Sequence, residues 1–246
     1  CLLRLRYWIE VIGAEAVQAR GKHGILFLPN HPALIDPIIV LAELQSRFGI
    51  RALSDRDQID LPVVRTLAAR FGVLPIPDTG KYGEAARHEV EASLALCVAA
   101  LRQGDNLMLY PAGRIYRQRC EDVRGTSAVA TILKALPDVR VVLVRTRGLW
   151  GSGFGYASGA TPHFFQALGR GVLSLLASGV FFAPRRKVTV ELQEPLDLPR
   201  AAERFVLNRY LETFYNVDAP PNTYVPYTPW ERGGARAVPE PPTVKV

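Results

Sequence analysis

The sequence has few cysteines, scattered histidines and no long uninterrupted hydrophobic run. None of its three cysteines forms a CxxC pair, so a disulfide framework is not expected. A protein without disulfides is typical of a reducing compartment, which we expect here. Its four histidines lack the ligand spacing of a zinc site, so no metal is expected. A P-loop, a GxGxxG fingerprint and a stripe of interleaved basic and aromatic residues are also missing, which argues against nucleotide and nucleic-acid binding.

No stretch of the chain reaches the roughly 18 to 20 apolar residues that span a bilayer. The longest apolar segment covers residues 171–183, GVLSLLASGVFFA, and basic residues flank it on both sides: Arg170, then Arg185, Arg186 and Lys187. Such a segment can be a core helix, or an interfacial segment whose basic flanks contact anionic headgroups. Both interpretations stay open at this point.

What the chain does contain is the composition of a globular domain with a basic surface. Of its 246 residues 48% are hydrophobic and 22% are charged, and the 30 Lys and Arg residues exceed the 23 Asp and Glu residues to give a net charge of +7. A basic surface favours nucleic acid, anionic lipid headgroups or phosphorylated cofactors. Charge alone does not choose among them.

Segments with strand character alternate with segments of helical periodicity along most of the chain. Strands are expected at residues 5–11, 24–28, 50–53, 73–76, 106–110, 139–144 and 188–192. Helices are expected at residues 37–48, 61–71, 83–102, 126–136 and 200–215. This alternation predicts an α/β fold, with a mainly parallel or mixed central sheet covered by helices.

The last thirty residues differ from the rest. Residues 217–246 contain seven prolines, which predicts a Pro-rich C-terminal tail or linker after a domain that covers residues 1–216. An aromatic cluster at residues 224–230 can dock on that domain through its rings. The tail can also lead into a fused C-terminal domain of a longer chain.

The stretch with the most chemistry is residues 28–37, LPNHPALIDP. On a regular helix His31 and Asp36 would differ in direction by about 140° and face apart. Pro37 disfavours helical geometry at Asp36 and suits the first helical position, so Asp36 is predicted to be the N-cap of a helix that starts at Pro37. A tight turn would bring His31 back to the Asp36 carboxylate, which fixes the imidazole tautomer and leaves the other nitrogen as a base. The spacing alone is equally compatible with a simpler interpretation, in which Asp36 only caps the helix and His31 only fills the turn.

A second informative stretch is residues 107–114, LMLYPAGR, where a strand ends in a Pro-x-Gly turn that presents Arg114. Ligands of α/β sheets usually bind beyond the carboxyl ends of strands. Turn amides together with an arginine suit a phosphate. A plain turn with a solvated arginine is the alternative interpretation.

Both stretches resemble motifs of the glycerolipid acyltransferases, the family that includes 1-acylglycerol-3-phosphate acyltransferase. Asn30-His31-x-x-x-x-Asp36 resembles the first, HX4D motif, which also follows a strand in that family. Residues 110–114, YPAGR, resemble the third motif, Phe-Pro-Glu-Gly followed by Thr-Arg or directly by Arg. The form here is similar to that of 2-acylglycerophosphoethanolamine acyltransferases. Ala112 stands where the family has a glutamate that is thought to help bind the glycerol-phosphate acceptor.

The second and fourth motifs of the family are altered. Its Gly-x-x-Phe-Ile-x-Arg pattern aligns with residues 72–78, where Asp78 replaces the arginine that meets the acceptor phosphate. Lys81 could substitute as a point charge, without the bidentate fork of arginine. The Val-Pro-Val pattern aligns with residues 141–143 without its proline, and Arg145 follows. These changes leave the identity of the acceptor open.

The resemblance implies a glycerol-3-phosphate acyltransferase-like fold and acyl transfer from a thioester to a hydroxyl of a lysophospholipid-like acceptor. It implies His31 as the general base and Asp36 as the carboxylate that holds it. The acyl donor would be acyl-CoA or acyl carrier protein, with no metal or redox cofactor. The residues that the resemblance and the motif positions assign to substrate binding are Asn30, Lys81, Ala112, Gly113, Arg114 and Arg145.

The implied partners are the acyl donor, a lysophospholipid and a membrane surface, without nucleic acid. The implied location is peripheral, on the cytoplasmic face of a membrane.

Two other hypotheses remain. Ala112 and Asp78 motivate a degenerate member of the family that binds lipid or acyl carrier without turnover. The net charge of +7 motivates an unrelated α/β protein that binds a phosphorylated or nucleic-acid ligand.

Overall fold

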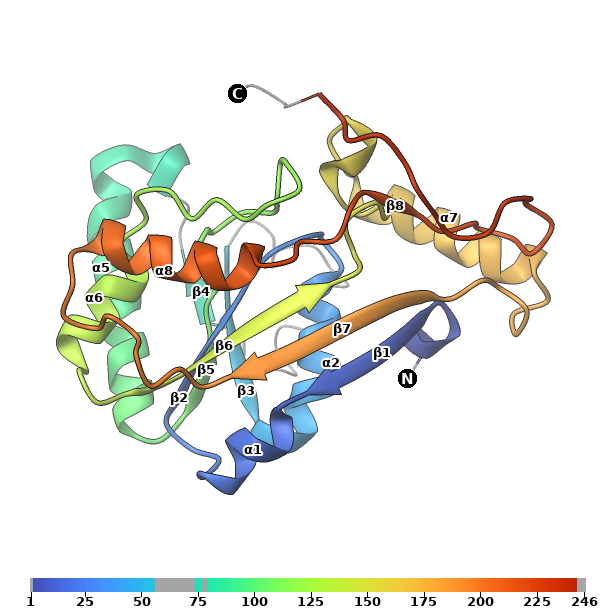
Figure 1. The fold of residues 1–246 in the computed structure, drawn as a ribbon. Helices are drawn as coiled ribbons and strands as arrows, with labels where there is room; N and C mark the ends of the chain where they lie inside the picture. Colours follow the sequence, from blue (N-terminus) through green and yellow to red (C-terminus); the bar gives the residue numbers. More distant parts are fainter. Residues whose placement is uncertain (1, 56–73, 77–78, 243–246) are drawn as a thin grey trace.

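A mixed seven-stranded sheet runs through the middle of the molecule (Figure 1). The structure, a computed structural model, describes residues 2–55, 74–76 and 79–242, and side chains outside residues 53–89. The strand order is β1-β7-β6-β2-β5-β3-β4, and every neighbouring pair is parallel except β6 and β7. The strands are β1 (Tyr7–Ile12), β2 (Ile25–Pro29), β3 (Ile50–Asp55), β4 (Leu74–Ile76), β5 (Asn106–Met108), β6 (Arg140–Arg147) and β7 (Arg186–Gln193). The predicted α/β class with a mixed sheet is confirmed.

Helices cover both faces of this sheet (Figure 1). They are α1 (Ala14–Ala19), α2 (Asp36–Phe48), α5 (Thr79–Arg102), α6 (Ala128–Ala135), α7 (Phe164–Ala177) and α8 (Arg204–Asn216). Short 3-10 turns occur at Leu2–Leu5 and Tyr156–Ser158, and a small hairpin pairs β8 (Thr223–Tyr224) with β9 (Arg236–Ala237). Across the part of the chain that the structure describes, every helix is too short or too polar to cross a bilayer.

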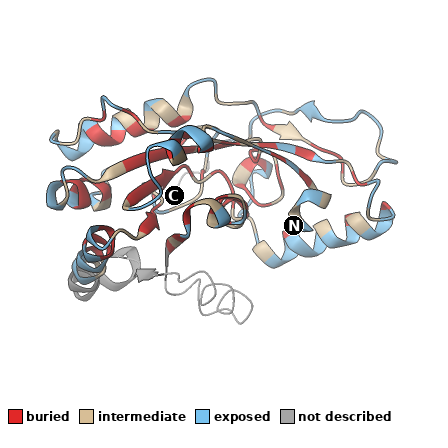
Figure 2. Cartoon of the chain, turned by 90° about the horizontal axis from the view of Figure 1, so that it is seen from below, coloured by how far each residue is buried: buried red, intermediate tan, exposed pale blue. Residues whose placement is uncertain are grey.

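The central position of strand β2 in the sheet explains why its sequence, ILFLP, is apolar at every position. Alternate side chains of a strand point to opposite faces. Ile25 and Phe27 belong to the core that includes α1 and α2, whereas Leu26 and Leu28 belong to the core that includes α5, α6 and α8. Figure 2 shows the strands buried between helices whose outer faces are exposed. Because β2 is central and covered on both sides, the loop that follows it is held by a rigid strand.

Most predicted elements are present within one to four residues of the expected bounds. The predicted helix at residues 61–71 lies outside the described residues. Helix α1 was not predicted. Helix α7 covers residues 164–177, whereas the apolar segment was placed at residues 171–183.

The aromatic cluster of the C-terminal segment docks on the rest of the chain, where it packs against α7. The Ser174 hydroxyl donates to the Tyr227 carbonyl, and the Arg6 guanidinium lies 5.2 Å from the centre of the Tyr227 ring. Asn222 is buried, and its amide donates to the Ala157 carbonyl at 3.0 Å. The segment therefore lies on the surface of the fold through residue 240, while a domain boundary at residue 216 stays a prediction.

Candidate active site

The loop between β2 and α2 brings His31 and Asp36 together. His31 Nδ1 lies 2.7 Å from Asp36 Oδ2. The Asp36 side chain is completely buried, and the His31 side chain keeps 15% of its surface exposed. A carboxylate at Nδ1 selects the tautomer with the proton on that nitrogen, so the lone pair of Nε2 is available as a base. The predicted turn that folds His31 back onto Asp36 is present.

Asp36 is the first residue of α2, and the prediction that it acts as the N-cap of a helix starting at Pro37 is wrong. Ile35 is the N-cap, in helical geometry, and no side chain caps the helix. Oδ2 of Asp36 instead accepts the His31 hydrogen bond and a longer one, 3.3 Å, from the Ala33 amide. Because the carboxylate is turned back toward the preceding loop, it does not reach the free amides of the helix.

Tyr110 completes the surroundings of this carboxylate. Its hydroxyl donates to Asp36 Oδ1 at 2.6 Å, and its ring centre lies 4.3 Å from that of His31. Burial and, next, the Asp36 charge raise the pKa of Tyr110 well above its usual value, so the phenol stays protonated and donates. Sequence reasoning noted Tyr110 only as a replacement for Phe. Its position just past the end of β5, the strand beside β2, was the available signal.

Asn30 links the ends of two neighbouring strands. It is buried, and its side-chain amide donates to the Thr146 carbonyl at 3.1 Å while its oxygen accepts from the Thr146 amide at 2.7 Å. A further hydrogen bond joins Asn30 to the Tyr116 hydroxyl. All of these contacts are internal, so in this structure Asn30 fixes the start of the motif loop to β6.

The segment after β5 holds the His31 backbone from both sides. The His31 amide donates to Glu121 Oε2 at 2.8 Å, and the His31 carbonyl accepts from the Tyr116 amide at 2.9 Å. Burial raises the pKa of Glu121 to about 7, against the lowering effect of the His31 amide. No local motif marks Glu121 or Tyr116 in the sequence, because their partner lies about 90 positions away.

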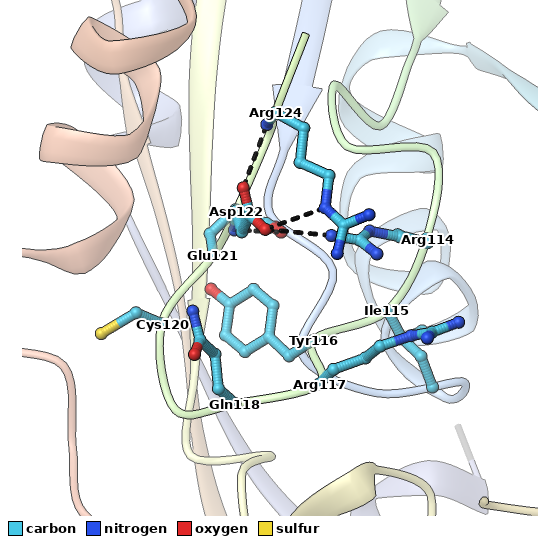
Figure 3. A pocket seen from close by; sticks show the side chains of 9 residues that line it. All are labelled: Arg114, Ile115, Tyr116, Arg117, Gln118, Cys120, Glu121, Asp122 and Arg124. Carbon is cyan, nitrogen blue, oxygen red and sulfur yellow. Dashed lines mark hydrogen bonds and ion pairs between the residues drawn. The ribbon is translucent and has the colours of Figure 1, made fainter. Parts of the chain in front are cut away.

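The Pro-x-Gly turn leads into a small basic pocket. Ala112 is buried and Gly113 has a left-handed φ of 65°. Arg114 Nη2 donates to Asp122 Oδ2 at 3.1 Å, and Arg124 Nε donates to the same oxygen at 3.0 Å (Figure 3). Burial and the nearby charges of Arg124 and Arg117 lower the pKa of Arg114. Two guanidinium groups thus share one aspartate, and Arg117 is a third arginine at the pocket. The residues that line the pocket are Arg114, Ile115, Tyr116, Arg117, Gln118, Cys120, Glu121, Asp122 and Arg124.

Arg145, another predicted substrate-binding residue, contacts β7 and α8. Arg145 donates to Glu191 through Nε at 3.1 Å and Nη2 at 2.7 Å, and its Nη1 donates to the Phe214 carbonyl at 2.8 Å. The guanidinium is therefore engaged between β7 and α8. Asp78 and the Lys81 side chain lie outside the described residues. Within the described residues, no three His, Cys, Asp or Glu side chains are placed to hold a metal ion.

Comparison with known proteins identifies the family of the chain. The sequence model of the family named Acyltransferase matches residues 8–149, which include the His31 loop and the basic turn. The chain belongs to the acyltransferase family. This confirms the resemblance found in the motifs, while the roles of His31 and Asp36 stay predictions.

The fold of this acyltransferase is also similar to a solved structure. The 1-acyl-sn-glycerophosphate (LPA) acyltransferase PlsC from Thermotoga maritima superposes with a TM-score of 0.57 at 14% sequence identity. The match covers 87% of this chain and 71% of that one. At this identity the similarity establishes the fold alone. A search of curated proteins found none that matches the sequence.

Proposed function

We propose that this acyltransferase moves a fatty acyl group from an acyl thioester to a hydroxyl of a lysophospholipid-like acceptor. The observation that carries the proposal is the 2.7 Å contact between His31 Nδ1 and a fully buried Asp36 carboxylate. Nε2 of His31 takes the proton of the acceptor hydroxyl as its oxygen attacks the thioester carbonyl. Asp36 offsets the positive charge that forms on the ring.

The reaction is then completed without a covalent enzyme intermediate. The new C–O bond forms, the C–S bond of the tetrahedral intermediate breaks, and the thiolate leaving group takes the proton back from His31 Nε2. General-base catalysis of this kind contributes about 10²- to 10⁴-fold to the rate. The donor is an acyl-CoA or an acyl carrier protein, and the steps need no metal or redox cofactor.

The basic pocket supports an acceptor with an anionic headgroup. Arg114, Arg117 and Arg124 line it together with Glu121 and Asp122, so three positive side chains face two carboxyl groups and a phosphate oxygen would meet a small excess of positive charge. Tyr116 and Glu121 line the same pocket and hydrogen-bond the His31 backbone. We assign Arg114, Ala112 and Gly113 to this acceptor region.

Helix α7 supports a peripheral position on a membrane surface. Its small residues Ala167 and Ser174 face the protein, whereas a stripe of large apolar residues faces solvent: Phe165, Leu168, Val172, Leu173 and Leu176. These positions recur at intervals of three and four, as on one face of a helix. Leu173 is 67% exposed and Leu176 63% exposed. A folded domain rarely leaves such a face to water, which favours an apolar partner.

The surroundings of α7 suit an anionic bilayer. Residues 164–187 contain no acidic residue, and Phe181 and Phe182 extend the exposed apolar surface beyond the helix end. Arg170 on the helix and Arg185 after it add positive charge, whereas Lys187 is paired with Glu10 at 3.1 Å. The start of α7 also contacts the region of the motif loop, since the ring of Phe164 packs 5.7 Å from that of Phe154, whose carbonyl accepts from the Leu34 amide at 2.9 Å.

An assay with labelled acyl-CoA and labelled acyl-ACP against a panel of lysophospholipids tests the proposed reaction. Transfer by the wild type that is lost in His31→Ala, with an unchanged circular dichroism spectrum, is the expected result. Binding of lysolipid or acyl carrier without transfer by any donor would instead support a binding domain that has lost turnover. Transfer at the wild-type rate by His31→Ala would remove the proposed mechanism.

A further inference from the structure

Glu121 is a buried carboxylate that the proposed reaction steps do not use. Its side chain is among the least exposed charged groups described, with 5% of the residue surface accessible. Oε2 accepts the His31 amide at 2.8 Å, and Oε1 accepts the Asp122 amide at 3.3 Å. A buried carboxylate is costly unless its oxygens find donors, and one of the donors here is the backbone of the base itself.

The loop that carries Glu121 is fixed independently of the motif. Asn216 of α8 accepts from the Glu121 amide at 2.7 Å and donates to the Glu121 carbonyl at 2.9 Å. Glu212, also on α8, accepts from the Val123 amide at 2.8 Å. Since the same loop donates the Tyr116 amide to the His31 carbonyl, both sides of the His31 residue are held by a segment anchored on α8.

We propose that Glu121 is a positioning residue for His31: its carboxylate fixes the His31 backbone so that Nδ1 meets Asp36, and its negative charge favours the imidazolium formed in the reaction. The inference deepens the proposed function and depends on it. Orientation matters because the 2.7 Å contact of the ring with Asp36 follows from the backbone of a short loop. Charge matters because the Glu121 carboxylate lies 2.8 Å from the His31 backbone nitrogen and interacts electrostatically with His31 in a desolvated site.

The charge of Glu121 changes near neutral pH. Burial raises its pKa to about 7, more than the His31 amide and the His31 charge lower it. The other charged or titratable groups that face it are Asp36, Arg114, Tyr110, Tyr116 and Tyr215, and the Asp122 backbone amide also donates to it. Ionisation of Glu121 should therefore raise kcat as the pH passes through about 7.

Two variants separate the hydrogen bond from the charge. Glu121→Gln keeps an oxygen acceptor for the His31 amide and removes the charge. We expect its kcat to fall about 3- to 10-fold at pH 8, to match the wild type at pH 6, and its KM to stay within about twofold. Glu121→Ala removes both, and we expect kcat to fall about 10- to 100-fold at both pH values.

Glu212→Gln is the matched control, because Glu212 holds the same loop through the Val123 amide without touching His31. Its kcat should stay within about twofold of the wild type. Wild-type kcat in Glu121→Ala, or a rise in KM at constant kcat, would overturn the positioning proposal. A pH profile of Glu121→Gln identical to that of the wild type would overturn the charge effect.

An NMR measurement keeps this test separate from the test of the reaction. The His31→Gln variant removes the titration of the imidazole. In this variant the amide signal of residue 31 should shift with pH, with a midpoint near or above pH 7. Adding Glu121→Gln should abolish that shift. A flat signal in His31→Gln overturns the inference whether or not the protein transfers acyl groups. If the signal titrates in His31→Gln while the wild type transfers no acyl group, the positioning inference stands and the proposed function fails.

Discussion

The hydroxyl of Tyr110 donates to Oδ1 of Asp36 across 2.6 Å, although the two residues are 74 positions apart. The other oxygen of the carboxylate accepts from His31 and from the Ala33 amide. Both oxygens of a fully buried charge are thus satisfied. Tyr110, where the family motif has Phe, therefore supports the carboxylate that holds the base.

Removal of this hydroxyl should weaken both stability and turnover. In Tyr110→Phe, Oδ1 of Asp36 loses its donor inside the protein, and we expect a loss of about 1–3 kcal/mol in the free energy of unfolding and a lower kcat. Urea unfolding and acyl-transfer kinetics measure the two effects. Tyr210→Phe is the control, because its hydroxyl donates to Asp197 at the same 2.6 Å but in an exposed position, where the loss should be below about 1 kcal/mol. Equal losses in the two variants would contradict this account.

Asp36→Asn should reduce activity while it leaves the fold in place. An asparagine can present its NH₂ group to Nδ1, which moves the imidazole proton to Nε2 and removes the lone pair that the acceptor hydroxyl needs. We expect kcat to fall about 10²- to 10⁴-fold. His23→Ala serves as the control, because this exposed histidine precedes β2 at the end of the strand opposite the site. Retention of more than a tenth of the wild-type kcat by Asp36→Asn would argue that the pair is structural.

Stability should fall between about pH 4.5 and pH 7 because of Glu121. The folded protein holds this proton up to a pKa of about 7, whereas the unfolded chain releases it at the ordinary value of 4.5. Between these values the folded state binds more protons, so the free energy of unfolding decreases as pH rises, by about 3 kcal/mol for this group. Glu121→Gln should remove that decrease, as urea unfolding at several pH values can show. An unchanged pH dependence in the variant would mean that burial does not raise this pKa.

Binding to anionic vesicles should depend on the exposed face of α7. The double change Leu173→Asp and Leu176→Asp places two charges on the apolar stripe, and we expect flotation with phosphatidylglycerol-containing vesicles to fall at least about tenfold. Leu196→Asp is the control, because Leu196 is 88% exposed on the loop after β7. Vesicle binding that is unchanged by the α7 variant would exclude this face as the membrane contact.

Arg145 should matter for stability and not for substrate affinity. Arg145→Met leaves Glu191 without the two hydrogen bonds of the guanidinium, and we expect a loss of about 2 kcal/mol in the free energy of unfolding. Its KM for the acceptor should stay within about twofold of the wild type. A rise in KM at unchanged stability would restore the substrate-binding assignment that the sequence suggested.

Local signals in the sequence predicted the elements near the site and the pair at its centre. The continuous apolar run of β2 and the proline-bracketed turn after it allowed His31 and Asp36 to meet, and the resemblance to the family motif favoured that pair over a plain helix cap. The same signals placed the start of α2 one residue late, because a carboxylate before a proline is usually a cap and here it binds His31 and Tyr110 instead. Glu121 and the engagement of Arg145 with Glu191 were not predictable, because each depends on segments that only the tertiary fold brings together.

Helix α7 shows a different limit of sequence reasoning. Its apolar residues were visible in the segment 171–183, but the sequence predicted neither the helix bounds of 164–177 nor the face that meets the protein. The structure shows that alanine and serine face inward and that leucine and phenylalanine face outward. That orientation depends on the C-terminal segment, whose Tyr227 carbonyl accepts from Ser174.

The pairing of β1 with β7 sets the order in which the chain can fold during synthesis. Tyr7 lies opposite Arg186, so the ribosome adds about 180 residues after β1 before its partner strand exists. At about 5–20 residues per second, β1 waits roughly 10 to 40 seconds without its place in the sheet. The strand of this sheet that is synthesised first is therefore among the last to pair, and a nascent chain released before β7 carries an unpaired strand that is open to aggregation.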